Sequence, residues 1–221
     1  SPILGWTVFC GDVRAAFLSG STFDRIIIVK LPSDCSAMLG CVGPTFMKMK
    51  KSAYGLSDAP LLWWTEADRR LRSLKLVRHR LDKCAYMIYS NYGKENQKLV
   101  GLLILHVDDI LLGIDMRDAE AVQKLDEIKG AFDFGKWQEL TDKQDIIYCG
   151  GRISRKDSNI SLDFESYIKK VMPITIHKGR GHGDVLTPAE VSKARALIGA
   201  LQWPAGGMPL FECIHIPECC Q

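Results

Sequence analysis

Several short runs are rich in apolar, β-branched and aromatic residues, and 45–50 also alternates between apolar and polar positions, which predicts a series of β-strands. The runs with this pattern are 4–10, 25–32, 45–50, 84–90, 98–107, 110–114, 145–154 and 159–164. Only Asp108 and Asp109 separate 98–107 from 110–114. The pattern therefore predicts a hairpin whose bend is Val107–Asp109, and strands joined by so short a bend pair antiparallel.

Apolar residues at helical spacing predict helices between and after these strands. The first begins near Pro60 within 58–76 and places on one face Leu61, Trp64, Leu71 and Leu74. The second, within 115–132, carries Ala119, Val122, Leu125 and Ile128. Residues 165–172 predict a third helix, and 173–186 a linker. Thr187 and Glu190, with Pro188 between them, form a capping box that starts a fourth helix through Trp203. The order of elements is too irregular for a doubly wound parallel sheet, so the predicted fold class is α+β with a largely antiparallel sheet.

The composition is that of an ordinary globular protein: 221 residues, 47% hydrophobic and 25% charged. The N-terminal stretch lacks a basic region followed by an apolar one, so it does not read as a signal peptide. Asp108 and Asp109 interrupt the longest apolar run before it could cross a bilayer. Eight cysteines without a C-x-x-C pair fit a reducing compartment. We therefore expect a soluble intracellular protein, cytoplasmic or nuclear, that is neither secreted nor membrane-bound.

The C-terminal stretch "ECIHIPECC" contains three residues of types that bind metals, Cys213, His215 and Cys219. Their spacing matches no zinc module, so no metal site is predicted there.

Net charge is only +3, but it is unevenly distributed. Residues 46–83 carry ten Lys and Arg against four acids, whereas 115–145 carry nine acids against five bases. Two interpretations stay open for the basic stretch. It is either the solvated face of a helix or a track for a polyanion such as a nucleic acid.

Three aspartates stand at the ends of apolar strands: Asp12 after the first, and Asp108 and Asp109 in the predicted bend. Carboxylates gathered on one patch repel each other unless a cation binds them. Two Mg²⁺ ions about 3.5–4 Å apart are the usual arrangement for nucleotidyl transfer. Alternatives remain, because Asp is common in turns and Asp12 could be the N-cap of a short helix through Ala15, Ala16 and Phe17.

Several motifs resemble the reverse transcriptase of copia-type LTR retrotransposons. "DVRAAFLSG", "KMKKSAYGLSDAPLLWW" and "LLILHVDDILLGI" resemble three successive motifs of that family, the last being its Y-V-D-D. "AFDFGKWQEL", "YCGGRIS", "ISLDFESYIKKVM" and "LTPAEVSKARALIGALQW" follow in the family's order. The resemblance covers about Val8 to Trp203, and its collinear order makes it far more specific than any single motif.

The resemblance implies a right-hand polymerase palm, an antiparallel sheet backed by helices, that is an RNA-directed DNA polymerase. The metal-binding catalytic residues would be Asp12, Asp108 and Asp109, holding two Mg²⁺ ions, with Mn²⁺ as a possible substitute. Phe17 would be the aromatic ring that clashes with a ribose 2′-hydroxyl. The backbone N–H of Ala16 would lie near the incoming nucleotide.

The resemblance also implies contacts with a template–primer and a deoxynucleoside triphosphate. The nucleotide and template would be supported by Tyr54, Gly55 and Pro60. The primer end would be held at Cys149, Gly150 and Gly151. The basic residues expected on the nucleic acid are Lys48, Lys50, Lys51, Arg69 and Arg72.

The chain departs from the family pattern at several positions. His106 stands in place of Tyr before the aspartates, Ser57 and Asp58 in place of Lys and Gln, and Leu61 in place of Arg. The last three changes remove positive charge near the expected template, and Asp58 adds a negative one. The tail after Trp203 also differs from the family.

By this resemblance, 1–154 would be the palm, 155–203 a thumb or connection-like segment, and 204–221 a divergent tail. The fingers, whose basic residues hold the triphosphate, and the ribonuclease H, integrase and protease regions of a polyprotein are expected to lie outside this chain. A polymerase fragment is the main interpretation. An inactive remnant that at most binds nucleic acid is the alternative, and another palm enzyme such as a nucleotide cyclase fits less well because Phe17 and Tyr54–Gly55 would have no role in it.

Overall fold

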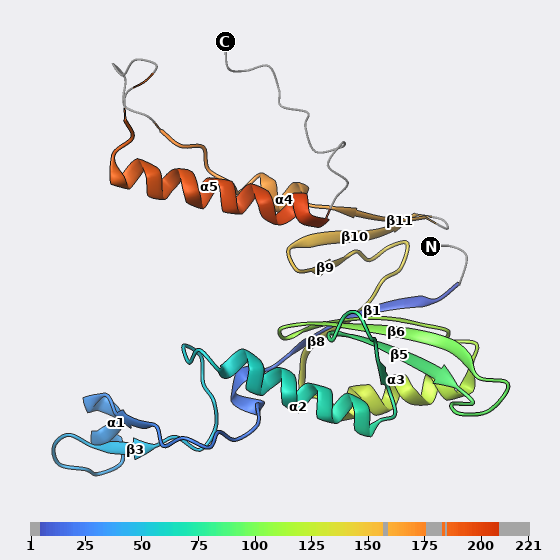
Figure 1. Ribbon diagram of the computed structural model, residues 1–221, viewed down its shortest axis with the longest axis horizontal. Helices are drawn as coiled ribbons and strands as arrows, with labels where there is room; N and C mark the ends of the chain where they lie inside the picture. Colours follow the sequence, from blue (N-terminus) through green and yellow to red (C-terminus); the bar gives the residue numbers. More distant parts are fainter. Residues whose placement is uncertain (1–4, 157–158, 176–182, 184, 208–221) are drawn as a thin grey trace. The chain divides into compact units, whose positions relative to one another are not determined.

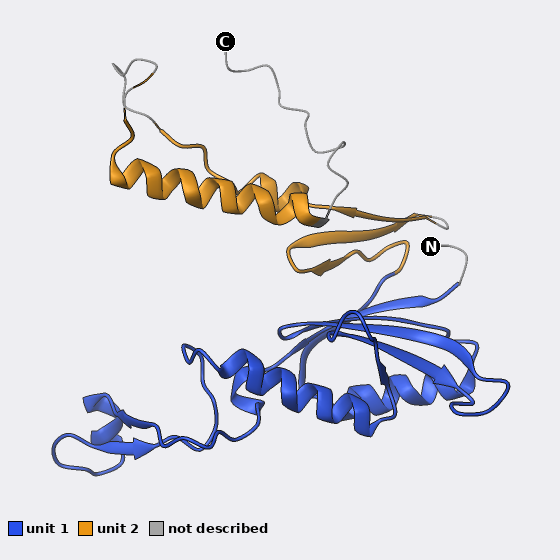
Figure 2. Ribbon diagram, viewed as in Figure 1, with its two compact units in different colours: residues 1–140 blue, residues 141–221 orange. Residues whose placement is uncertain are grey.

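The computed structural model describes residues 5–156, 159–175, 183 and 185–207 (Figure 1). The chain divides into two compact units, residues 1–140 and 141–221 (Figure 2). Each unit has its own β-sheet, and the two are described separately below.

A six-stranded antiparallel sheet forms the centre of the first unit, in the order β4-β5-β6-β7-β1-β8. Its strands are β1 (Thr7–Val13), β4 (Val77–Arg78), β5 (Ala85–Ser90), β6 (Lys98–His106), β7 (Asp109–Ile114) and β8 (Phe134–Glu139). The predicted α+β class with antiparallel pairing is therefore confirmed. The hydrophobic alternation did not predict β4, which has two residues, or β8, where polar residues dominate.

Helices α2 (Ala59–Ser73) and α3 (Ala119–Ala131) lie on one face of this sheet (Figure 1). Alternate residues of β7, Ile110, Leu112 and Ile114, are completely buried in the core that the helices and the sheet share. Burying side chains of this size contributes about 1.5–3 kcal/mol each to folding. The residues that lie between these buried ones in each strand face the other side of the sheet.

The predicted apolar face of α2 was correct at Leu71, which is buried, and at Leu74, which packs against the core, but it was wrong at Leu61 and did not include Trp63. Leu61 is 63% exposed, and Trp64 is only half-buried, whereas Trp63, Ala67 and Leu71 are buried against the sheet. Residues four apart stack along one side of a helix, so Trp63, Ala67 and Leu71 form one stripe. Because Trp63 and Trp64 are adjacent, the sequence allowed either a stripe through Trp63 or a stripe through Trp64 to face the sheet. The stripe through Trp63, which also contains the small residues Ala59 and Ala67, is the one that packs there.

The predicted face of α3 was correct at Leu125 and Ile128, which are buried, and wrong at Ala119, which is exposed. Ala121 is buried in its place. The helix starts at the cap Asp118, whose side chain accepts a hydrogen bond from Ala121 N at 3.1 Å.

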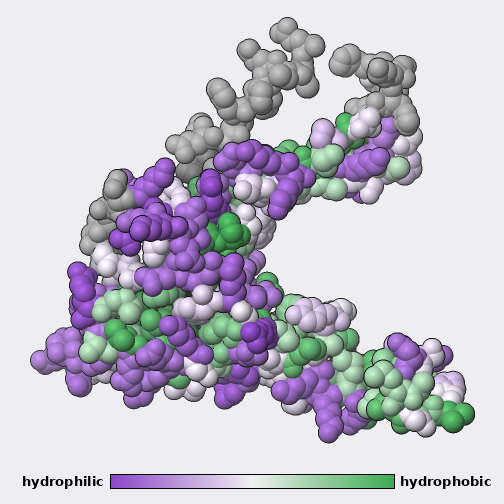
Figure 3. Space-filling view, turned by 180° about the vertical axis from the view of Figure 1, so that it is seen from behind, coloured by the Kyte–Doolittle hydropathy of each residue, from purple (hydrophilic) through white to green (hydrophobic). Residues whose placement is uncertain are grey.

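A small lobe follows β1 within the first unit. It comprises the 3₁₀ helix η1 (Ala16–Ser19), β2 (Ile28–Lys30), α1 (Ser33–Met38) and β3 (Phe46–Lys48). Strands β2 and β3 pair antiparallel but are shorter than the predicted runs 25–32 and 45–50, and α1 was not predicted. Hydrophobic side chains gather on the surface of this lobe (Figure 3), where Ile28, Val42 and Phe46 are exposed.

The second unit contains a three-stranded antiparallel sheet in the order β11-β10-β9. Its elements are β9 (Ile146–Tyr148), β10 (Gly151–Lys156), β11 (Asn159–Asp163), α4 (Glu165–Ile168) and α5 (Pro188–Gly207). The single strand predicted over 145–154 is instead two strands, because the chain turns at Cys149–Gly150. The predicted helix 165–172 ends at Ile168.

The capping box that starts α5 is confirmed. Thr187 N donates to Glu190 Oε2 at 2.7 Å, and Glu190 N donates to Thr187 Oγ1 at 3.3 Å. Much of the predicted linker 173–186 lies outside the described residues, as do Cys213, His215 and Cys219 of the tail. Among the described helices, none combines the length and hydrophobicity needed to cross a bilayer.

Candidate active site

Two of the three predicted acids lie directly opposite each other. β1 and β7 pair antiparallel with Asp12 opposite Asp109, although 96 residues separate the two positions in the chain. Side chains directly opposite in an antiparallel pair lie on the same face, with Cβ atoms about 4.5–5.5 Å apart. The interpretation of Asp12 as a helix N-cap is therefore wrong, because Asp12 belongs to β1 and Ala15 precedes η1.

The same row continues across four strands. On β8, Lys136 is opposite Asp12, and on β6, His106 is opposite Asp109. The row Lys136–Asp12–Asp109–His106 thus crosses β8, β1, β7 and β6 on the face away from α2 and α3. Lys136 was missed in the sequence because β8 shows no clear alternation, so nothing indicated its register beside Asp12.

Asp108 occupies the bend with Val107. The bend has two residues, because His106 pairs with Asp109, so it is one residue shorter than predicted. The carbonyl of Asp108 accepts a hydrogen bond from Val13 N at 2.8 Å, which ties the bend to β1 beside Asp12. The carbonyl of Val107 accepts a hydrogen bond from Trp63 Nε1, which ties the bend to α2 as well.

The backbone at the bend is unusual. Val107 has a φ of 55°, in the left-handed region that β-branched residues rarely adopt. The hydrogen bonds to the carbonyls of Val107 and Asp108 hold this conformation from both sides. Such local strain persists where surrounding structure fixes the backbone, and it clusters at functional sites.

The acids provide hard oxygen ligands of the kind that Mg²⁺ prefers. Asp12 is exposed, and Asp108 and Asp109 are half-buried, so solvent and ions can reach them. Within the described ranges, no group of three or more His, Cys, Asp or Glu side chains is arranged to hold a metal ion. The described residues thus bring the oxygen donors of Asp12 and Asp109 together but show no three-ligand metal site.

The predicted nucleotide-side residues Phe17 and Tyr54 also lie together. Their rings meet edge to face with centroids 5.0 Å apart, although they come from η1 and from the segment before α2. Ala16 is completely buried, whereas Tyr54 is 61% exposed. Gly55 adopts a φ of 92°, and Pro60 lies in the first turn of α2.

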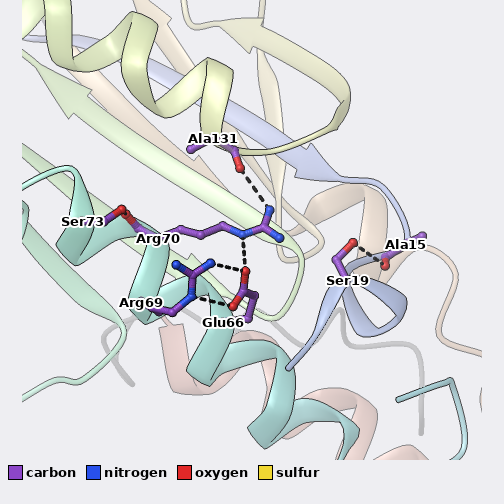
Figure 4. A network of polar contacts seen from close by, with 7 residues as sticks. All are labelled: Ala15, Ser19, Glu66, Arg69, Arg70, Ser73 and Ala131. Carbon is purple, nitrogen blue, oxygen red and sulfur yellow. Dashed lines mark hydrogen bonds and ion pairs between the residues drawn. The ribbon is translucent and has the colours of Figure 1, made fainter. Parts of the chain in front are cut away.

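The basic residues predicted to contact nucleic acid fall into two different environments. Lys48, Lys50 and Lys51 are exposed on and after β3. Arg69 instead donates two hydrogen bonds to Glu66, at 2.9 and 2.7 Å, and Arg70 donates a third at 2.7 Å (Figure 4). The bond from the Arg69 side chain, with that from Arg70, lowers the pKa of Glu66 to about 2 despite partial burial.

Arg72 is likewise paired, since its guanidinium lies 3.7 Å from Asp68. Asp68 is buried and also contacts Arg78 at 3.2 Å and the Tyr86 hydroxyl at 3.0 Å. The α2 part of the basic stretch is thus largely neutralised by acids of its own helix. Helix α2 therefore carries less unpaired positive charge than the sequence predicts.

Asp58, which stands where the family has Gln, is also paired with an oppositely charged side chain. Its carboxylate forms an ion pair with Arg25 at 2.8 Å, so the negative charge that departs from the family pattern is compensated by a residue of the small lobe.

In the second unit, Cys149 and Gly150 form the turn between β9 and β10, with φ values of 50° and 82°. Trp203 Nε1 donates to the Cys149 carbonyl at 3.0 Å, which holds this turn against α5. A Cβ on Gly151 would lie 2.8 Å from a terminal methyl of Leu162, so a side chain there would require Leu162 to move. The predicted primer-side residues Cys149, Gly150 and Gly151 therefore lie at the β9–β10 turn and the start of β10.

Comparison with known proteins agrees with the motifs. Residues 2–177 match the family described as "Reverse transcriptase (RNA-dependent DNA polymerase)". The chain is 29% identical over 164 residues, 73% of its length, to the "Retrovirus-related Pol polyprotein from transposon TNT 1-94" of Nicotiana tabacum. It spans 11% of the length of that relative.

Proposed function

The chain belongs to the reverse transcriptase (RNA-dependent DNA polymerase) family, as the copia-type motifs predicted, and from this premise we propose that it forms the catalytic palm of such an enzyme. The reaction is template-directed transfer of a deoxynucleotide to a primer 3′-hydroxyl. The observation that carries the proposal is the opposition of Asp12 and Asp109 beside the Asp108 bend. We propose the palm over 1–154, a thumb or connection-like segment over 155–203, and a divergent tail over 204–221.

Asp12 and Asp109 would hold the divalent cations, with Asp108 as the third ligand. Bound Mg²⁺ would lower the pKa of the attacking hydroxyl and stabilise the charge of the leaving pyrophosphate. Like charges directly opposite each other on a sheet destabilise it. A cation between these carboxylates would remove that cost, which is a physical reason for the pair to be kept.

The chain's own residues would orient the other reactants. Phe17, fixed beside Tyr54, would exclude a 2′-hydroxyl from the sugar position. The exposed lysines Lys48, Lys50 and Lys51 would contact backbone phosphates of the template–primer. The β9–β10 turn at Gly150–Gly151 would contact the primer end.

The test is a Mg²⁺ titration of the thermal stability of this chain, followed by primer extension, with Mg²⁺ and deoxynucleotides, by the chain joined to the fingers segment of a related polymerase. Wild type should gain melting temperature with Mg²⁺ by mass action on the folded state. Asp12→Asn and Asp109→Asn should lose most of that gain and all extension. Asp126→Asn, which changes an exposed acid of α3, is the matched control and should behave as wild type.

A wild type whose stability ignores Mg²⁺ and whose primer stays unextended would contradict the proposal. If that protein still bound template–primer, it would be the inactive remnant that is the alternative to a working polymerase.

A further inference from the structure

Ser52 is a buried polar residue in the irregular segment between β3 and α2, with 1% of its surface exposed. Its hydroxyl donates a hydrogen bond to the backbone carbonyl of Phe17, 35 residues earlier in the chain. A second donor, Gly20 N, lies 3.4 Å from the same carbonyl. Of these two donors, the Ser52 hydroxyl is the closer to the Phe17 carbonyl. It links the backbone of Phe17 to the segment before α2.

The packing around Ser52 is tight. A Cβ on Gly20 would lie 2.9 Å from Ser52 Oγ and 3.1 Å from the backbone nitrogen of Trp63. Ser21 N donates to Leu62 O at 3.1 Å, so the chain just after η1 is bonded to the first turns of α2. Ser52 fills the space that the missing side chain of Gly20 leaves between η1 and α2.

The same segment also fixes the Phe17 side chain. Tyr54, two residues after Ser52, contacts the Phe17 ring edge to face at 5.0 Å. Ser52 therefore holds the backbone of Phe17, while Tyr54 limits where its ring can turn.

We propose that Ser52 is a positioning residue that sets the place of the Phe17 ring and thereby the selectivity for deoxyribose over ribose. This inference rests on the proposed function, in which Phe17 excludes the 2′-hydroxyl. Exclusion by contact requires the ring to stay within about 0.5 Å of its place. A backbone freed from the Ser52 hydroxyl would let the ring withdraw and admit the larger sugar.

The first experiment needs no nucleotide. The 221-residue chain is labelled with 4-fluorophenylalanine, and the Phe17 fluorine resonance is the one missing in Phe17→Leu. Ser52→Ala should shift or broaden that resonance and leave the other assigned resonances in place. Ser52→Cys, which keeps the size and a weaker donor, should give a smaller change.

Ser36→Ala is the matched control. Ser36 is also buried, and its hydroxyl also donates to a backbone carbonyl, that of Pro32, at 3.2 Å. This control should leave the Phe17 resonance unchanged. An unchanged Phe17 resonance in folded Ser52→Ala would overturn the positioning role, and so would an equal change in Ser36→Ala.

The second experiment measures affinities for dGTP and GTP, with Mg²⁺ and template–primer, for the same variants in the chain joined to the fingers segment of a related polymerase. Ser52→Ala should lower the preference for dGTP roughly fivefold, the factor that one ordinary hydrogen bond corresponds to. The dGTP affinity itself should change less. A preference that survives in Ser52→Ala would overturn the selectivity role, whereas wild type that shows no preference would count against the proposed function itself.

Discussion

Trp63 on α2 donates a hydrogen bond from its indole nitrogen to the carbonyl of Val107, the first residue of the bend that carries Asp108. Trp63 is 1% exposed and also packs against Phe132 at the end of α3. One side chain thus joins the helical layer to the bend at which the acids lie. The left-handed conformation of Val107 depends on contacts of this kind.

Replacing Trp63 by Phe should keep most of the buried ring area but remove the donor. We expect a loss of about 0.5–1.5 kcal/mol in the free energy of unfolding, because the part-buried hydrogen bond to the Val107 carbonyl is lost. Urea denaturation measures this loss. Trp64→Phe is the control, since the Trp64 nitrogen makes a longer bond of 3.4 Å to Lys83 O at an exposed site. Equal losses in the two variants would show that the bond to Val107 contributes nothing specific.

Gly11, next to Asp12 on β1, should not tolerate a side chain. A Cβ there would lie 2.5 Å from Trp137 and 2.7 Å from Phe134, whose rings cover that part of the strand. Gly11→Ala should therefore lower the free energy of unfolding by about 1–3 kcal/mol. Gly113→Ala on the neighbouring strand is the control, because its Cβ would meet Trp6 at an ordinary 3.5 Å. If thermal denaturation shows Gly11→Ala to be as stable as Gly113→Ala, the rings do not pack on β1 as described.

Acid should destabilise the protein in a window set by Glu66 and Asp115. The pKa of each carboxyl is lowered to about 2, chiefly by hydrogen bonds from Arg69 and Arg117 respectively. Ordinary values are 4.5 and 3.8, so the unfolded chain binds more protons between about pH 4.5 and pH 2. Stability is fully present above that window and is lost as pH falls through it.

In this pH window the protein takes up protons when it unfolds, and Glu66→Gln should lower their number by up to one. Denaturation curves at a series of pH values give that number. Glu95→Gln, at an exposed site, serves as control. An unchanged pH slope in Glu66→Gln would mean that the Arg69 and Arg70 contacts do not persist in solution.

Template–primer affinity should depend more on the lysines of β3 than on the arginines of α2. Replacing both Lys48 and Lys50 by Gln should weaken binding and lower the slope of log affinity against log salt by up to about 2. Replacing both Arg69 and Arg72 by Gln should change the slope less, because Glu66 and Asp68 already pair with these guanidinium groups. Fluorescence anisotropy at several salt concentrations measures both slopes. A larger effect from the arginine pair would mean that nucleic acid displaces the helix's own acids.

Local patterns in the sequence determined the elements whose signals lie within a few neighbouring residues. The hairpin of β6 and β7, the capping box at Thr187 and Glu190, and the family motifs were all readable in this way. The three aspartates could be named as a set because each stands at the end of an apolar run.

Tertiary structure decided the relationships between residues far apart in the chain. Pairing of β1 with β7 brought Asp12 opposite Asp109, and the pairing of β8 added Lys136, whose strand has no apolar alternation. Packing chose Trp63 over Trp64, since helical spacing alone permits either stripe to face the sheet. The sequence assigned no role to Ser52, because a hydroxyl becomes a specific donor only when folding buries it against one carbonyl, here that of Phe17.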